Sequence, residues 1–199
     1  EIRVRAALRF RARSTQAFDL LTQIGRDCVG ALQILPDGLA PDDVHRLDVT
    51  PLDEGDVASI LRGTVAPPAM AGASHADEDD FRISIAGAQE KTALAWIDGR
   101  WCLPHGSTPT THILKPRIGR LPGGIDLTHS VENEFYCLKL AAAFGLPVAK
   151  AEMADFGGTA ALVIERFDRL HARDGRLLRL PQEDCCQALS VPPTRKYQA

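Results

Sequence analysis

Residues 83–92 read I-S-I-A-G-A-Q-E-K-T, and this stretch decides the fold class. One glycine lies between two alanines, and small residues let backbone N–H groups approach phosphate oxygens. The following residues, T-A-L-A-W-I, have the pattern of a strand and run into Asp98-Gly99, a strong hairpin signal. The stretch therefore indicates a loop between two strands, with a composition suited to phosphate.

The stretch matches neither common phosphate-loop pattern in full. A Walker A loop needs a glycine before Lys91-Thr92, where this chain has Glu90, and it needs Thr92 to begin a helix. A protein-kinase glycine loop lies between two strands, as here, but Gly87 is the only glycine of that motif present. A P-loop NTPase is therefore disfavoured, and on the motif alone a plain hairpin loop is the simpler interpretation.

The order of the elements that follow favours a kinase-like small lobe. The strand T-H-I-L-K ends in Lys115, a helix then carries Glu132 and Glu134, and two more strands lead to the segment 165–168, E-R-F-D. In a kinase small lobe, a strand lysine holds the α- and β-phosphates and pairs with a helix glutamate. The sequence leaves open which glutamate pairs with Lys115, with Glu134 preferred.

Local patterns predict an α+β fold, with a mostly antiparallel sheet and one long helix. Helices are expected at 14–25, from Pro51 to about Arg62, and at 130–145, where Ser130 is the expected N-cap and Gly145 the stop. Strands are expected at 29–36, 81–85, 92–97, 100–103, 112–115, 147–153, 159–165 and 177–180. Residues 36–53 and 117–126 are expected to be loops, Pro181 suits the first turn of a helix, and the Pro-rich and acidic residues 64–80 are the best linker.

Bulk properties exclude several classes of protein. Hydrophobic residues make up 45% and charged residues 25% of the 199 residues, as in a globular chain. A net charge of -3 argues against coating nucleic acid by charge alone. No apolar run approaches a membrane helix or a signal-peptide core, and the five cysteines form no C-x-x-C pair, so we expect reduced thiols, no metal site in this chain and a cytoplasmic location.

Two short matches to kinase motifs are set aside. Residues 155–157, D-F-G, spell the magnesium motif, but they precede Glu165 and suit a hairpin turn. Residues 45–48, H-R-L-D, precede the candidate nucleotide loop and are not the catalytic H-R-D.

Several long blocks of the chain resemble the HipA family, the serine/threonine kinase toxins of bacterial type II toxin–antitoxin systems. These blocks are S-I-A-G-A-Q-E-K-T-A-L, T-P-T-T-H-I-L-K, S-V-E-N-E-F-Y-C-L, E-R-F-D-R and L-R-L-P-Q-E-D, with F-D-L-L-T-Q-I-G-R-D-C-V-G-A-L-Q-I matching the N-terminal subdomain. The resemblance implies ATP and Mg²⁺ as cofactors and a translation component, such as glutamyl-tRNA synthetase, as substrate. It also implies a HipB-type antitoxin as partner, through which the kinase meets operator DNA.

The resemblance also implies roles for individual residues. The phosphate loop would comprise Ala86, Gly87, Ala88, Gln89, Glu90 and Lys91. Lys115 would bind the nucleotide phosphates, Glu165, Arg166 and Phe167 would form the adenine-contacting hinge, and Ser84 would be autophosphorylated. The chain would divide into part of a HipA-type N-terminal subdomain (1–63), a linker (64–80) and a kinase-like small lobe with the hinge and the start of the large lobe (81–199).

The chain departs from the family in its extent. The family's catalytic-loop Asp and Asn and its magnesium-binding Asp are expected beyond Ala199, and the family's first strands are missing. We therefore expect the chain alone to be inactive in phosphoryl transfer. The alternative is a non-catalytic module that docks an antitoxin or a separate kinase subunit.

Overall fold

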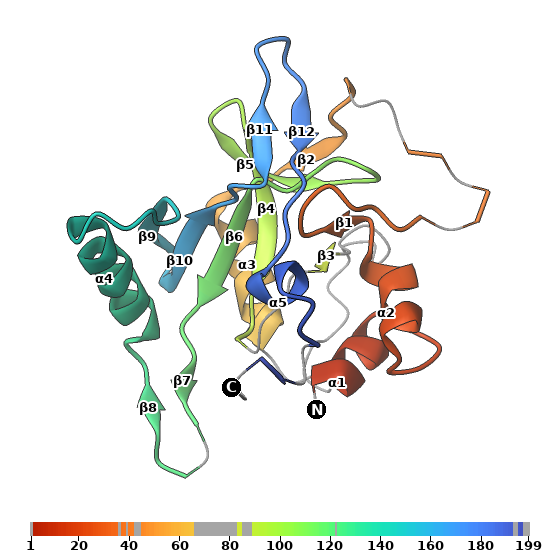
Figure 1. Ribbon diagram of the computed structural model, residues 1–199. Coiled ribbons are helices and arrows are strands. Elements are labelled where there is room, and N and C mark those ends of the chain that lie inside the picture. The colour runs from red at the N-terminus through yellow and green to blue at the C-terminus, as the bar shows by residue number, and fades with distance from the viewer. Residues whose placement is uncertain are drawn as a thin grey trace.

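The computed structural model shows a mixed α+β protein built around an antiparallel sheet (Figure 1). It describes residues 2–35, 37–38, 40–41, 45–65, 83–84, 89–121, 123–192 and 195–196. Among these residues the main sheet has six strands in the order β2-β5-β4-β6-β10-β9, each antiparallel to its neighbours. The strands are β2 (Val49–Pro51), β4 (Thr92–Ile97), β5 (Arg100–Pro104), β6 (His112–Pro116), β9 (Ala151–Phe156) and β10 (Thr159–Glu165). The predicted α+β class is confirmed.

Two hairpins build most of this sheet, and both follow from their turn residues. Asp98 and Gly99 join β4 to β5 with φ angles of 51° and 77°. Gly157 and Gly158 join β9 to β10 with φ angles of 55° and 84°. Positive φ at both central residues is the geometry that matches the right-handed twist of the flanking strands, and glycine adopts it without a steric penalty.

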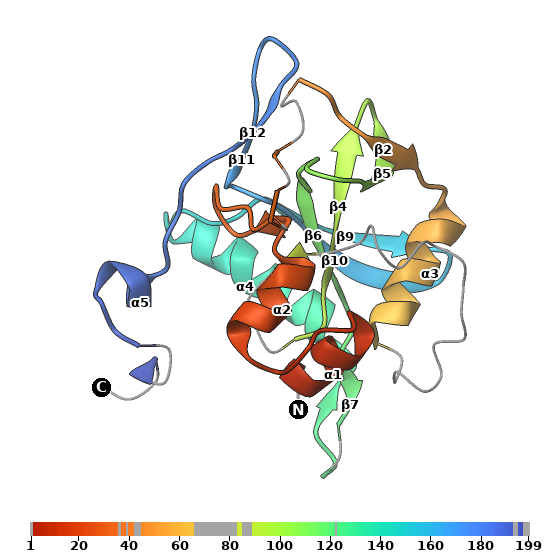
Figure 2. The ribbon, with the colours of Figure 1, turned by 90° about the vertical axis from the view of Figure 1, so that its right-hand side faces the viewer.

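One face of the sheet packs against α3 (Glu54–Val65) and forms the hydrophobic core (Figure 2). Val57 and Leu61 of α3 are 0% exposed, as is Leu114 of β6, while Val163 of β10 is 2% exposed. Side chains alternate along a strand, so Leu114 points into this core and the adjacent Lys115 points to the other face.

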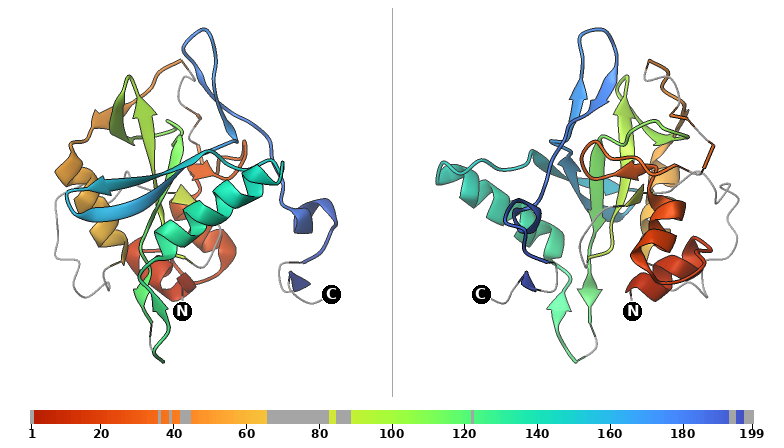
Figure 3. Two further views of the ribbon diagram at one scale, coloured as in Figure 1. Left: turned by 90° about the vertical axis from the view of Figure 1, so that its left-hand side faces the viewer. Right: turned by 45° about the vertical axis from the view of Figure 1, so that its right-hand side comes forward.

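The second long helix, α4 (Ser130–Ala143), lies on the opposite face against β9 and β10 (Figure 3). It ends as predicted at Gly145, which has a φ of 78° and donates its N–H to the Ala142 carbonyl. Its start differs from the prediction. His129 is the N-cap residue, and the Ser130 hydroxyl instead accepts a hydrogen bond of 3.0 Å from the Ile118 N–H. Ser130 therefore ties α4 to the strand segment before it.

The remaining elements are short and lie around the sheet. They are α1 (Ile2–Arg9), α2 (Ala17–Ile24), β1 (Asp27–Cys28), β3 (Ile83–Ser84), β7 (Gly119–Arg120), β8 (Asp126–Leu127), β11 (Arg169–His171), β12 (Leu177–Arg179) and α5 (Cys185–Ala188). β1 pairs with β3 in parallel, β7 with β8 and β11 with β12 in antiparallel fashion. None of the helices in the described part of the chain is long and apolar enough to cross a membrane.

Several local predictions were wrong. Residues 29–35 form no strand, because the chain turns at Gly30 with a φ of 74°. The predicted loop 36–53 contains β2, an edge strand in which Pro51 is tolerated since edge positions leave ladder donors unused. The predicted loop 117–126 contains β7 and the start of β8. The helix expected after Pro181 begins only at Cys185, where Asp184 supplies a capping box.

β2 and α3 precede the predicted linker but belong to the sheet and its core. β2 pairs with β5 along residues 49–51, and α3 contributes Val57, Ala58 and Leu61 to the buried cluster. Thr64 and Val65, the first residues of the predicted linker, complete α3, while 66–80 lie outside the described residues. The division of the chain at 63, 64–80 and 81–199 stays a prediction.

The core makes a direct prediction for stability. Leu61→Ala should lower the free energy of unfolding by about 2–5 kcal/mol, because it removes buried methyl groups and leaves a cavity between α3 and the sheet. Leu140→Ala on α4 is the control, since that side chain is 44% exposed, and should cost about 1 kcal/mol or less. Urea unfolding of both variants tests this, and equal shifts would contradict the assignment of the core.

Candidate nucleotide site

Lys115 and Glu134 form an ion pair on the α4 face of the sheet. The Lys115 Nζ lies 2.6 Å from Glu134 Oε1. The lysine side chain is 20% exposed and the glutamate side chain 33%, so water screens the pair only in part. The pair fixes the ammonium group at the end of a strand in the middle of the sheet.

The structure distinguishes the two glutamates that the sequence left open. Glu134 contacts Lys115, whereas Glu132 Oε1 accepts a hydrogen bond from Arg117 Nη2. Two residues along a helix differ by about 200° in direction, so only one of the two carboxylates can face the strand lysine. The preferred pairing of Lys115 with Glu134 is the one observed.

Lys91 lies next to this pair. The register of β4 on β6 pairs Thr92 with Leu114, which places Lys91 opposite Lys115 one step further along. The Lys91 ammonium donates to the Gln89 carbonyl. Burial lowers the pKa of Lys91, the charge of Lys115 adds to this effect, and Glu90 and Glu134 oppose it. An anion between the two lysines would relieve both their repulsion and their incomplete solvation.

The rest of the predicted phosphate loop is described only in part. Gln89, Glu90 and Lys91 are within the described residues, and the Gln89 side chain donates to the Pro116 carbonyl at 3.4 Å. The backbone of Ser84 lies in β3. Ala86, Gly87 and Ala88 lie outside the described residues, so the loop assignment stays a prediction.

The predicted hinge follows β10, and its backbone groups point in alternating directions. The Arg166 N–H donates to Thr111 at 2.8 Å, toward β6, and the Glu165 N–H donates to Lys150 at 2.9 Å, toward the other edge. β10 ends at Glu165, and Phe167 and Asp168 then form a turn in which the Arg169 N–H donates to the Arg166 carbonyl at 3.3 Å. In the described part of the chain, no acceptor is found for the Phe167 N–H.

The Arg166 side chain is buried and ion-paired, and its predicted place in the hinge stays a prediction. Its side chain is 2% exposed, and its guanidinium binds Asp27 at 3.1 Å and Asp168 at 2.8 Å. Its N–H is already bonded to Thr111. In the predicted hinge, the Glu165 and Arg166 N–H groups are thus both bonded to the chain itself, and the contact with adenine stays a prediction.

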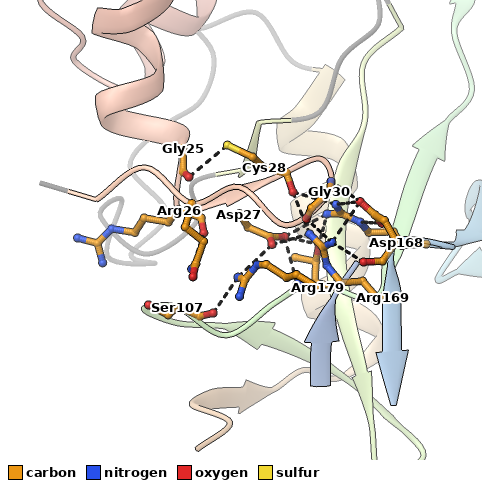
Figure 4. A network of polar contacts seen from close by, with 12 residues as sticks. Gly25, Arg26, Asp27, Cys28, Gly30, Ser107, Asp168, Arg169 and Arg179 are labelled. Carbon is orange, nitrogen blue, oxygen red and sulfur yellow. Dashed lines mark hydrogen bonds and ion pairs between the residues drawn. The ribbon is translucent and has the colours of Figure 1, made fainter. Parts of the chain in front are cut away.

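Arg166 belongs to a buried network that the sequence reasoning did not find (Figure 4). Two carboxylates, Asp27 and Asp168, meet three guanidinium groups, those of Arg166, Arg169 and Arg179. Charged residues are almost never fully buried unless they are paired. The only sequence signal was the run of charges R-F-D-R after an apolar strand, which does not indicate its distant partner in the segment G-R-D-C.

The network lowers the pKa of the Asp168 carboxyl group. Burial alone would raise the pKa of Asp168, but hydrogen bonds from Arg166 and the Gly30 N–H, with the arginine charges, bring that pKa below its ordinary value. A carboxylate with a depressed pKa stabilises the fold at neutral pH, and this contribution is lost only as the pH falls through the lowered pKa. Asp168 is therefore a charged partner for the arginines at neutral pH.

Two clefts are found among the described residues, and neither is lined by Lys91 or Lys115. One, of about 410 Å³, lies between α3 and the β9–β10 turn and is lined in part by Arg62 and Arg117. The other, of about 260 Å³, lies between α4 and the approach to β9. The charge arrangement, not the depth of a cleft, identifies the candidate site.

Two alternatives from the sequence are now decided. Thr92 begins the strand β4 rather than a helix, which excludes a Walker A loop. The D-F-G-G segment is a hairpin turn, in which the Gly158 N–H donates to Asp155 Oδ1 at 2.7 Å. No cluster of three or more His, Cys, Asp or Glu side chains suited to a metal ion occurs among the described residues.

Comparison with known proteins supports the kinase-like interpretation. The chain matches the family model of the HipA-like C-terminal domain over residues 83–199. It is 44% identical over 183 residues to "Putative kinase Y4mE" of Sinorhizobium fredii (strain NBRC 101917 / NGR234), covering 90% of this chain and 41% of the relative. It is 32% identical over 183 residues to the serine/threonine-protein kinase toxin HipA of Shewanella oneidensis, covering 91% of this chain and 38% of the relative.

A solved structure matches over almost the whole chain. It is the complex of HipA, HipB and operator DNA from the Shewanella oneidensis MR-1 toxin–antitoxin system, with a TM-score of 0.70 and 28% identity, covering 98% of this chain and 42% of that chain. The antiparallel sheet with α4 packed on it is thus a protein-kinase-like small lobe. The chain belongs to the HipA family, as its sequence blocks indicated. It spans about two fifths of the length of these relatives.

The turn at Asp155 gives a second prediction. Asp155→Asn in the full-length protein should leave magnesium-dependent ATP binding unchanged, because the Asn oxygen can accept the same hydrogen bond from Gly158. Gly158→Ala should destabilise the protein by about 1–2 kcal/mol, because its φ of 84° disfavours a side chain. Titration with ATP-magnesium and thermal unfolding measure both effects. Lost magnesium dependence in a folded Asp155→Asn protein would restore the metal-binding interpretation.

Proposed function

We propose that this chain is the ATP-binding small lobe of a HipA-type serine/threonine protein kinase toxin. The observation that carries the proposal is the 2.6 Å contact between Lys115 on a central strand and Glu134 on the helix across the sheet. In protein kinases, this ion pair positions the lysine on the nucleotide phosphates. Membership of the HipA family, with relatives named as kinases, supports the same conclusion.

The residues present fit ATP bound across the α4 face of the sheet. Lys115 would hold the phosphates, with Lys91 beside it, and two close cations accommodate an anion better than they accommodate each other. The Phe167 N–H and the Glu165 carbonyl would take the adenine edge. ATP supplies the phosphoryl group, and Mg²⁺ would be held by residues expected beyond Ala199, together with the catalytic Asp.

The biological setting follows from the relatives and is part of the proposal. The Shewanella structure contains HipA with HipB and operator DNA, so we propose a HipB-type antitoxin as the partner, with operator DNA bound through it. The substrate would be a translation component such as glutamyl-tRNA synthetase. Phosphoryl transfer would be an activity of the full-length protein and not of this chain alone.

Lys115→Met in the full-length protein tests the proposal directly. We expect a loss of roughly a hundredfold or more in the rate of autophosphorylation, because a preorganised positive charge at the phosphates is removed. The free energy of unfolding should change by less than about 1 kcal/mol. Lys139→Met, at an exposed position on α4, is the matched control and should keep full activity. Full activity of Lys115→Met would refute the assignment.

The two glutamates provide an internal comparison. Glu134→Gln should weaken ATP binding and slow the kinase, because the Lys115 ammonium loses its charged partner. Glu132→Gln should change both quantities little, since Glu132 pairs with Arg117 at a more exposed site. If the two substitutions lowered ATP affinity equally, the Lys115–Glu134 ion pair would have no special role in ATP binding.

Autophosphorylation at Ser84 would act as a self-inactivating switch. A phosphate there adds about -1.5 to -2 charges and competes for the backbone donors that would bind the triphosphate. Full-length protein with phosphate on Ser84 should therefore bind ATP-magnesium more weakly than unmodified protein, and Ser84→Ala should bind normally. Titration of forms verified by mass spectrometry measures this, and identical affinities and rates would rule the switch out.

A further inference from the structure

The strand that carries Ser84 is held by a very short partner. β3 pairs in parallel with β1, with Ile83 opposite Asp27 and Ser84 opposite Cys28. Two residues on each side supply few backbone hydrogen bonds, and isolated strand pairs are marginal at best in water. The position of β3 therefore depends on what holds β1.

The Asp27 side chain holds β1. Its Oδ2 accepts hydrogen bonds from the Thr110 N–H at 3.1 Å, the Thr110 hydroxyl at 2.6 Å and Arg166 Nη1 at 3.1 Å. Its Oδ1 accepts from Arg169 at 2.9 Å and Arg179 at 3.2 Å. The carboxylate side chain is 7% exposed. Removing this carboxylate would leave Asp168 to pair with Arg166 and Arg169 and would take the ion-pair partner from Arg179, which is strongly unfavourable for buried charges.

Two of the arginines that bind Asp27 flank Phe167 in the sequence. Arg166 precedes it and Arg169 follows it, and both also donate to the Cys28 carbonyl, at 3.1 and 2.9 Å. Asp168 accepts the Gly30 N–H at 2.7 Å. The strand before the phosphate loop and the segment proposed to contact adenine therefore share one buried anchor (Figure 4).

We propose that Asp27 is a positioning residue that fixes the phosphate end of the nucleotide site relative to its adenine end. The inference rests on the proposed ATP-binding function. Asp27 is buried in the network and acts through β1 and the arginines, without touching the nucleotide. Loosening this anchor should weaken the binding of a ligand that contacts both ends of the site more than the binding of a ligand that contacts only one end. Only the first ligand requires the correct spacing between the two ends.

The experiment compares ATP with adenosine in the full-length protein. Thr110→Val keeps the volume but removes the hydroxyl that donates to Asp27 and accepts from Arg166, while Thr110→Ser keeps that hydroxyl. Asp27→Asn removes the charge itself and serves as the stronger variant if it folds. Calorimetric titration with ATP-magnesium and with adenosine is carried out well below each melting temperature, which is measured separately.

We expect Thr110→Val to bind ATP about tenfold or more weakly and adenosine within about twofold of wild type, because only ATP spans both ends. Thr110→Ser should restore ATP affinity. A lower melting temperature with unchanged ATP affinity would mean that the network is only structural and would overturn the inference alone. An equal loss for adenosine would overturn it as well. A wild-type protein that fails to bind ATP would refute the proposed function and the inference together.

Discussion

The buried ion pairs between Asp27 and three arginines, Arg166, Arg169 and Arg179, are the interaction on which the rest of the structure depends. Asp27 is separated by 139 residues from Arg166 and by 142 from Arg169, yet its carboxylate contacts both. Burying these charges is costly, and only a complete set of partners offsets the cost. The N-terminal segment therefore docks in one position or not at all. That single position also fixes β3 and the backbone around Phe167.

The two faces of the sheet differ in what they carry: one carries the hydrophobic core and the other carries the Lys115–Glu134 ion pair. On one face, Leu114 and Val163 pack on α3 and provide the hydrophobic stability of the domain. On the other, Lys115 reaches Glu134 on α4. Because side chains alternate along β6, a residue that carries charge lies directly beside one that anchors the core. Lys115 therefore lies on a central strand of the sheet, which suits the proposed contact with the nucleotide phosphates.

The E-R-F-D-R segment combines buried charged side chains with an exposed aromatic side chain. Arg166, Asp168 and Arg169 are buried and face the network, at 4%, 4% and 8% exposure. Phe167, between them, is 73% exposed. The buried charged residues hold the turn at Phe167 and Asp168 in place through their ion pairs. One short segment therefore serves both the packing of the chain and the proposed adenine contact.

Local sequence determined the elements whose signals are local. The hairpins at Asp98-Gly99 and Gly157-Gly158, the stop of α4 at Gly145 and the strand ending at Lys115 all follow from turn chemistry and alternation. The family blocks also singled out Lys115, which the structure pairs with Glu134. Tertiary structure alone decided the rest. β2 depends on pairing with β5, the choice of Glu134 over Glu132 depends on the angle at which α4 crosses the sheet, and the Asp27 network joins distant residues. These contacts carry no periodic pattern in the sequence. The paired residues, 19 positions apart for Lys115 and Glu134 and 139 apart for Asp27 and Arg166, are brought together by how the elements pack and not by their neighbours in the chain.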